Sequence, residues 1–100
     1  MPTFLFAYRM PDDYTPGRPG AVEAWNSWFE GVGDAVVDRG NPVFESTSLG
    51  RSGAGTNLGG YSIVRADDLE SAVAVAKGCP SLDGGGGVEV GVITEIYRSA

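Results

Sequence analysis

The chain has 100 residues, which is enough for one domain, and we treat residues 1–100 as a single domain. Thirteen acidic and seven basic residues give a net charge of −6, which disfavours binding to the phosphate backbone of nucleic acids. The chain contains no histidine, so it lacks the Ser-His-Asp and Cys-His arrangements and the usual zinc ligands. A single cysteine, Cys79, excludes an internal disulfide. We therefore expect neither a metal nor a cofactor.

The sequence also predicts where the protein resides. No apolar run approaches the roughly 18 residues needed to cross a bilayer. The start, Met1-Pro2-Thr3-Phe4, lacks the basic segment of a signal peptide. We expect a cytoplasmic protein without a membrane partner.

The first predicted element is a strand from Thr3 to Arg9. Within it Phe4, Phe6 and Tyr8 point to one face, and the residues between them point to the other. A loop rich in proline, glycine and aspartate follows from residue 10 to residue 20.

A helix is predicted from Ala21 to about Arg39, because apolar residues recur at steps of three and four. This stripe consists of Val22, Trp25, Trp28, Phe29, Val32 and Val36. Gly40 is the predicted left-handed stop, and Pro42 forbids continuation.

Two further strands are predicted, from Val43 to about Leu49 and from Gly60 to Arg65. The glycine-rich residues 50–57 between them lack the lysine of a phosphate-binding loop and lead into a strand, so we interpret them as a hairpin connection.

The second helix is predicted to start at Asp67 as N-cap, with Glu70 three residues later. Its expected buried stripe is Leu69, Ala72, Val73 and Ala76. Glycines 84–87 are interpreted as a tight turn before a last strand from Val88 to Ile96.

The resulting order, β-α-β-β-α-β, predicts an α+β ferredoxin-like fold, with a four-stranded antiparallel sheet and both helices on one face. The other face is too apolar to meet water. Apolar side chains fall on both faces of the strands: Leu5 and Ala7 in the first, Tyr61, Ile63 and Val64 in the third, and Val88, Val90, Val92 and Ile93 in the last. A two-fold pairing of sheets into a dimeric α/β barrel would cover both faces, so we expect a homodimer in which Val90 and Val92 lie on a covered face.

Aromatic residues suggest a small-molecule pocket. Tyr8, Trp25, Trp28 and Tyr61 together could line an apolar cleft with polar tips. The same tryptophans, with Phe29, could equally be plain core. The polar residues worth testing near such a cleft are Arg9, Asn26, Asp34, Asp38 and Asn41.

Several stretches resemble the YCII-related family, in particular its DGPF-type branch. They are WFEGVGDAVVDRGNP (28–42), GYSIVRADDLESA (60–72), AKGCP (76–80) and GGGVEV (85–90). The resemblance covers nearly the whole chain and implies a dimeric α/β barrel of ferredoxin-like subunits. In one branch a histidine of the first helix and an aspartate form a catalytic pair. Because this chain has no histidine, that pair cannot be carried over.

Three functions are consistent with these observations. The first is a small-molecule-binding or accessory domain whose pocket is lined by Tyr8, Trp25, Trp28 and Tyr61, with Arg9 nearby. The second is an enzyme that uses Asp34 or Asp38 as general base, since burial can raise a carboxyl pKa towards neutrality. The third is a structural module that only assembles.

Overall fold

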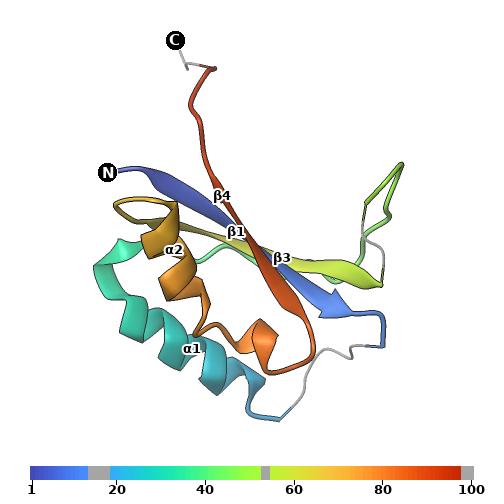
Figure 1. Ribbon diagram of the computed structural model, residues 1–100. Helices are drawn as coiled ribbons and strands as arrows, with labels where there is room; N and C mark the ends of the chain where they lie inside the picture. Colours follow the sequence, from blue (N-terminus) through green and yellow to red (C-terminus); the bar gives the residue numbers. More distant parts are fainter. Residues whose placement is uncertain (14–18, 53–54, 98–100) are drawn as a thin grey trace.

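The computed structural model describes residues 1–13, 19–52 and 55–97. The chain forms an α+β domain with a four-stranded antiparallel sheet in the order β2-β3-β1-β4. Its elements are β1 Thr3–Pro11, α1 Ala21–Val32, the 3₁₀ turn η1 Gly33–Ala35, β2 Val36–Asp38, β3 Thr56–Arg65, α2 Leu69–Ala76, the 3₁₀ turn η2 Pro80–Leu82 and β4 Gly87–Val92. Both helices lie on one side of the sheet (Figure 1). The predicted four-stranded antiparallel sheet with two helices is therefore confirmed.

The core lies between the helices and the central strand β1. Phe4, Phe6 and Tyr8 alternate along β1 and are buried, whereas Leu5 between them is 39% exposed. The neighbouring strands place side chains beside them on the same face, because Phe6 pairs with Ser62 of β3 on one side and with Val90 of β4 on the other. The predicted facing of β1 is confirmed. The strand is longer than expected, because Met10 and Pro11 still pair with β3. Of the predicted loop, residues 14–18 lie outside the described residues.

The first helix ends earlier than its apolar spacing predicts. It stops at Val32, and Gly33 takes a left-handed φ of 69° while its N–H donates to the Phe29 carbonyl. The extension to Arg39 with a stop at Gly40 was wrong. Val36, expected on the helical stripe, instead begins strand β2. Two glycines weaken this part of the helix, and the β-branched pair of residues 36 and 37 pairs well on a sheet edge.

The predicted strand from Val43 to Leu49 was also wrong. Residues 43–49 contain no strand, and the sheet takes Val36–Asp38 as β2 in their place. The chain nevertheless follows β3 for a few residues. Pro42 forms an isolated bridge with Gly60, and the Val43 N–H donates to the Gly59 carbonyl at 3.0 Å. After Val43 the Phe44 side chain is 68% exposed and residues 45–48 are polar, so this segment has no apolar face to bury against the sheet and the pairing ends there.

Strand β3 begins at Thr56, four residues before the predicted start, because its first residues pair with the extended end of β1. Residues 53 and 54 of the predicted connection lie outside the described residues. At the other edge β4 ends at Val92 rather than Ile96. Its partner β1 begins at Thr3, so the Ile93 N–H finds the Thr3 carbonyl at 2.9 Å and no further pairing is available. The following residues leave the sheet (Figure 1). In the single chain Val92 is 57% exposed.

The second helix begins one residue later than predicted. Asp68, not Asp67, is the N-cap, and its carboxylate accepts the Ser71 N–H at 2.8 Å. The buried stripe is also rotated: Ala72 and Ala76 are buried with Val75 beside them. Leu69 and Val73, expected in the stripe, are exposed. Both helices are short, and within the described residues none is long and apolar enough to span a bilayer.

The cap makes a testable prediction. The backbone and side chain of Ser71 hold the pKa of the Asp68 carboxyl below its ordinary value, so the folded state favours the ionised cap. Asp68→Ala is expected to lower Tm by a few degrees at neutral pH, measured by circular dichroism. Because the pKa of the Asp68 carboxyl is lower in the folded state, the difference in Tm between the two proteins is complete at a pH above the ordinary carboxyl pKa. The difference disappears as the pH falls through the lowered pKa of the folded state. Asp68→Asn retains a hydrogen-bond acceptor at the N-cap, so its Tm should fall less than that of Asp68→Ala. An equal loss in Asp67→Ala would contradict the assignment.

Candidate functional site

A cleft of about 850 Å³ opens beside the first half of α1. Its walls come from the start of α1, the end of β1, the start of β3 and residues 39–46. The lining is mostly apolar: Tyr8, Met10, Pro11, Gly20, Ala21, Val22, Trp25, Phe29, Gly40, Pro42, Val43, Phe44, Leu58, Gly59, Gly60 and Tyr61. The polar residues are Glu23, Asn26, Arg39, Asn41, Glu45, Ser46 and Asn57. A concave apolar surface with a few polar groups is the usual form of a small-molecule site.

The inner wall of the cleft is aromatic. The rings of Tyr8 and Trp25 meet edge to face with their centroids 4.7 Å apart. The centroids of the Trp25 and Phe29 rings are 6.0 Å apart. Such contacts hold large flat side chains in fixed positions at little entropic cost when a ligand binds. Val22 and Phe44 lie at the cleft with exposed fractions of 69% and 68%. These two side chains supply further apolar surface that a bound molecule could cover.

A hydrogen-bonded chain fixes the wall formed by residues 39–46. The Tyr8 hydroxyl donates to Ser62 Oγ at 2.9 Å, and Ser62 Oγ donates to the Arg39 carbonyl at 2.6 Å. Burial raises the pKa of the Tyr8 hydroxyl well above its ordinary value, although the Ser62 hydrogen bond acts in the opposite direction. The hydroxyl therefore stays protonated at neutral pH and remains a donor. Tyr61 adds a further tie, since its N–H donates to the Asn41 carbonyl at 3.3 Å.

Gly40 allows this wall to approach β3. Its φ is +72°, and a Cβ built there would collide with the Tyr61 carbonyl oxygen. Asp38 stabilises the same turn, because its carboxylate accepts the Gly40 N–H at 2.8 Å. The glycine predicted to end a helix instead forms a close contact between two backbones.

The Arg39 side chain lies against α1. Its Nη1 donates to Asn26 Oδ1 at 3.3 Å, and its guanidinium carbon lies 5.0 Å from the centroid of the Phe29 ring. Asn26 and Phe29 are three residues apart and so share one face of the helix. The guanidinium is thus held between an amide and an aromatic ring at the exposed end of the cleft.

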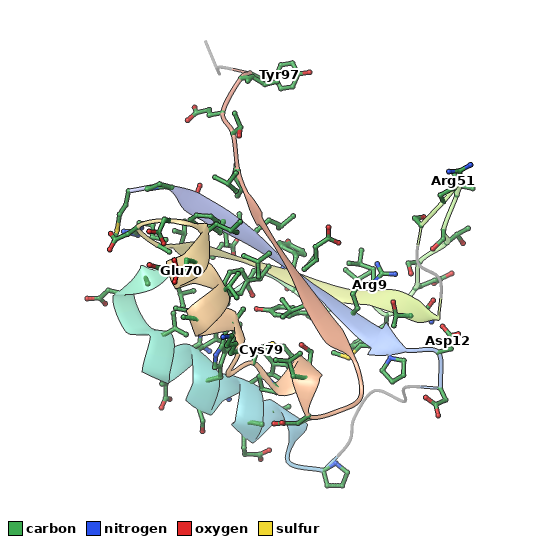
Figure 2. All side chains as sticks on the ribbon, viewed as in Figure 1. Arg9, Asp12, Arg51, Glu70, Cys79 and Tyr97 are labelled. Carbon is green, nitrogen blue, oxygen red and sulfur yellow. The ribbon has the colours of Figure 1, made fainter. Side chains whose placement is uncertain are left out.

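The structure brings three of the predicted site residues to the cleft, namely Tyr8, Trp25 and Tyr61. Trp28 does not line it. Its indole N–H donates to the Val75 carbonyl at 3.4 Å, and its ring packs 5.0 Å from Phe29. Arg9 lies beside β3 (Figure 2), where it donates to the Thr56 hydroxyl at 3.1 Å and to the Thr56 carbonyl at 3.0 Å. It is absent from the lining of the cleft.

The candidate acids are elsewhere. Asp34 is exposed in η1, Asp38 is exposed at the end of β2, and neither lines the cleft. Within the described ranges, no three His, Cys, Asp or Glu residues gather as a group that could hold a metal ion. Cys79 is buried on the helix side of the sheet (Figure 2), with its Sγ 3.0 Å from Ser81 Oγ.

The sequence reasoning missed Arg39 and the wall that follows it. Arg39 was predicted only as the approximate end of the first helix and was not named among the residues near the cleft. The useful signal was Gly33, whose position after Gly31 already offered an earlier end to the helix. Asn26 and Asn41, named among the polar groups to test, do line the cleft. In comparisons with protein-family models, curated proteins and solved structures, nothing matches this chain.

Proposed function

We propose that the protein is a small-molecule-binding domain. The observation that supports this proposal is the cleft beside α1, which combines an aromatic wall with a few polar groups. Its volume of about 850 Å³ is that of a site for a metabolite rather than for a single ion. Trp25 is central, because it contacts both Tyr8 and Phe29 and also faces the cleft.

The proposal predicts saturable binding that depends on Trp25. We would titrate the protein by isothermal titration calorimetry with 3-phenylpropanoate, its methyl ester and 3-phenylpropylamine, which share one apolar body and differ in charge. At least one should bind, and Trp25→Leu should weaken that binding by about tenfold or more, the loss expected for a large apolar contact. Leu69→Ala, which shortens an exposed side chain on α2 outside the cleft, is the control. If neither these probes nor larger acids and esters, such as 2-naphthylacetate and decanoate with their methyl esters, bind to the protein, this proposal fails.

The carboxylate enzyme remains a hypothesis of a different kind. A general base has to reach the substrate through at most one water, and both Asp34 and Asp38 lie outside the lining of the cleft. The Asp38 carboxylate already accepts the Gly40 N–H. The cleft thus gives more support to binding than to catalysis by these two acids.

We also propose that the subunit has the ferredoxin-like arrangement of the YCII-related family and pairs into a homodimer. The strand order β2-β3-β1-β4 and the placement of both helices on one side support the arrangement. The opposite side of the sheet supports the pairing, because Leu5 is 39% exposed beside half-buried Ile63. In the single chain these side chains face away from the helices. A second copy would bury them.

The homodimer makes its own prediction. Light scattering at micromolar concentration should give about twice the 10.4 kDa mass of one chain. Leu5→Asp should shift the protein to monomers, because an unpaired charge is costly to bury in an interface. The control is Leu82→Asp, which changes an exposed apolar residue on the helix side and should leave the dimer intact. A monodisperse monomer would contradict the pairing, and a dimer that binds none of these probes would favour the purely structural module.

A further inference from the structure

Charge within the cleft narrows the class of ligand. Among the described residues that line it, Arg39 is the one cation, and Glu23 and Glu45 are the acids. One guanidinium and two carboxylates give the described lining a formal net charge of 1 − 2 = −1, so the attraction for an anion is local to Arg39. A phosphate or a dicarboxylate would bring two negative charges to one guanidinium and two carboxylates, which is unfavourable. A ligand with a single negative charge faces a much smaller repulsion.

Arg39 is prepared to receive that charge. Both contacts described for its guanidinium are with neutral groups, the Asn26 amide and the Phe29 ring. Neither compensates the positive charge, and only one N–H is donated to Asn26, so other N–H donors of the guanidinium can bind a ligand. The planar guanidinium matches a carboxylate, which can accept two parallel hydrogen bonds from it.

The backbone of Arg39 is fixed as well. Its carbonyl accepts the hydroxyl of Ser62, which is itself held by Tyr8. Because the side chain contacts α1 and the main chain is bonded to β3, part of the ordering that ligand binding requires is already present. A pre-organised cation next to an aromatic wall favours a ligand with a charged end and an apolar body.

The apolar part of the ligand has a defined place. Trp25 and Phe29 lie next to each other on the cleft wall, and the Phe29 ring lies under the guanidinium. If a carboxylate binds to Arg39, the atoms attached to it therefore lie next to the aromatic surface. The exposed Phe44 side chain, in the wall of residues 39–46, is available to cover the other side of such a body, and the exposed Val22 extends the surface of α1 beside Trp25.

We propose that the cleft binds apolar monocarboxylic acids, with the carboxylate on the Arg39 guanidinium and an aromatic or long alkyl body against Trp25, which packs on the buried Phe29 ring. This inference rests on the proposed function of the cleft and adds the chemical class of its ligand.

The test compares matched acids and esters by isothermal titration calorimetry. The probes are 3-phenylpropanoate, 2-naphthylacetate and decanoate, each with its methyl ester, together with phenyl phosphate and 3-phenylpropylamine. At least one acid should bind about tenfold or more tightly than its ester, the usual gain from a charge-assisted hydrogen bond. Phenyl phosphate and the amine should bind no more tightly than the esters.

Arg39→Gln should reduce the affinity for that acid to the affinity for its ester, and should leave the ester unchanged. Arg39→Lys should fall between the two, because the charge remains and the planar donor is lost. The matched control is Arg65→Gln, which removes the same charge at the exposed end of β3, away from the cleft. Thermal melts of all three variants establish that they are folded.

The outcomes separate the two proposals. If the esters or the amine bind as tightly as the acids, the monocarboxylate inference is wrong. If the affinities for those probes also depend on Trp25, the proposal of a binding cleft still holds. Equal weakening of acid and ester by Arg39→Gln, or tightest binding of phenyl phosphate, would also overturn it. The absence of any binding across the whole set would overturn the proposed function itself.

Discussion

Gly40→Ala is expected to destabilise the protein by about 2–4 kcal/mol, which adds a left-handed backbone penalty to the cost of overpacking. Gly40 has a φ of +72°, and a Cβ there would meet the backbone carbonyl oxygen of Tyr61. A carbonyl in a paired strand cannot rotate away as the end of a flexible side chain can. The wall of residues 39–46 has to move instead. Urea denaturation followed by circular dichroism measures the loss.

A matched glycine separates the two contributions. Gly85 has a φ of +81°, and a Cβ built there has nothing within 4 Å. Gly85→Ala therefore retains the left-handed penalty and removes the collision, so we expect about 1–2 kcal/mol. If the two variants lose the same free energy of unfolding, the close approach of Gly40 to β3 does not contribute to the cost of the substitution.

Trp28→Ala is expected to cost about 3–5 kcal/mol, as large-to-small changes in a core do. Trp28 packs against Phe6 at 6.1 Å and Phe29 at 5.0 Å between ring centroids, and its indole N–H donates to the Val75 carbonyl. Its removal leaves a cavity between α1 and α2 and takes away one of the hydrogen bonds to the Val75 carbonyl, which still accepts the Gly78 N–H at 3.3 Å. The small domain has little stability to lose, so extensive unfolding is a natural result.

Trp25 provides the comparison. It contacts Tyr8 and Phe29 but one side of it faces the cleft, so part of its surface is not packed. We expect Trp25→Ala to destabilise less than Trp28→Ala and to affect ligand binding more. The measurement is a denaturant titration of both variants followed by far-UV circular dichroism, which does not rely on the deleted fluorophore. A Trp25 variant as unstable as the Trp28 variant would place both residues equally in the core.

The sequence predicted the parts of the fold that local periodicity determines. Alternation along β1 identified Phe4, Phe6 and Tyr8 as buried, and steps of three and four placed α1. The prediction from sequence failed between Gly33 and Leu49, where the helical spacing of apolar residues conflicts with the pairing of the chain with β3. Val36 fits the helical stripe and also fits a strand, and only contact with β3 decides between them. The error of one residue at Asp68 arose because two adjacent aspartates can both cap a helix.

The candidate site was predicted in part for the same reason. Trp25 and Tyr8 could be named because each lies on an element with a clear pattern. Arg39 could not, since its position depends on where α1 ends and on how the following chain pairs with Gly59 and Gly60. Trp28 and Trp25 share a helical face, so spacing alone could not tell which of them is covered by α2.

The tethering of residues 39–46 has a consequence for local opening. This wall is attached to β3 by a hydrogen bond to the Arg39 carbonyl, one to the Asn41 carbonyl and one from the Val43 N–H. It can therefore detach from the sheet without breaking the pairing of β1 with β3 or with β4. Segments held by few bonds open at a lower free energy than the global transition. Amide hydrogen exchange in the wall would then report this partial opening. A molecule bound between the wall and α1 would slow that exchange in proportion to its occupancy, even though the core strands would exchange as before.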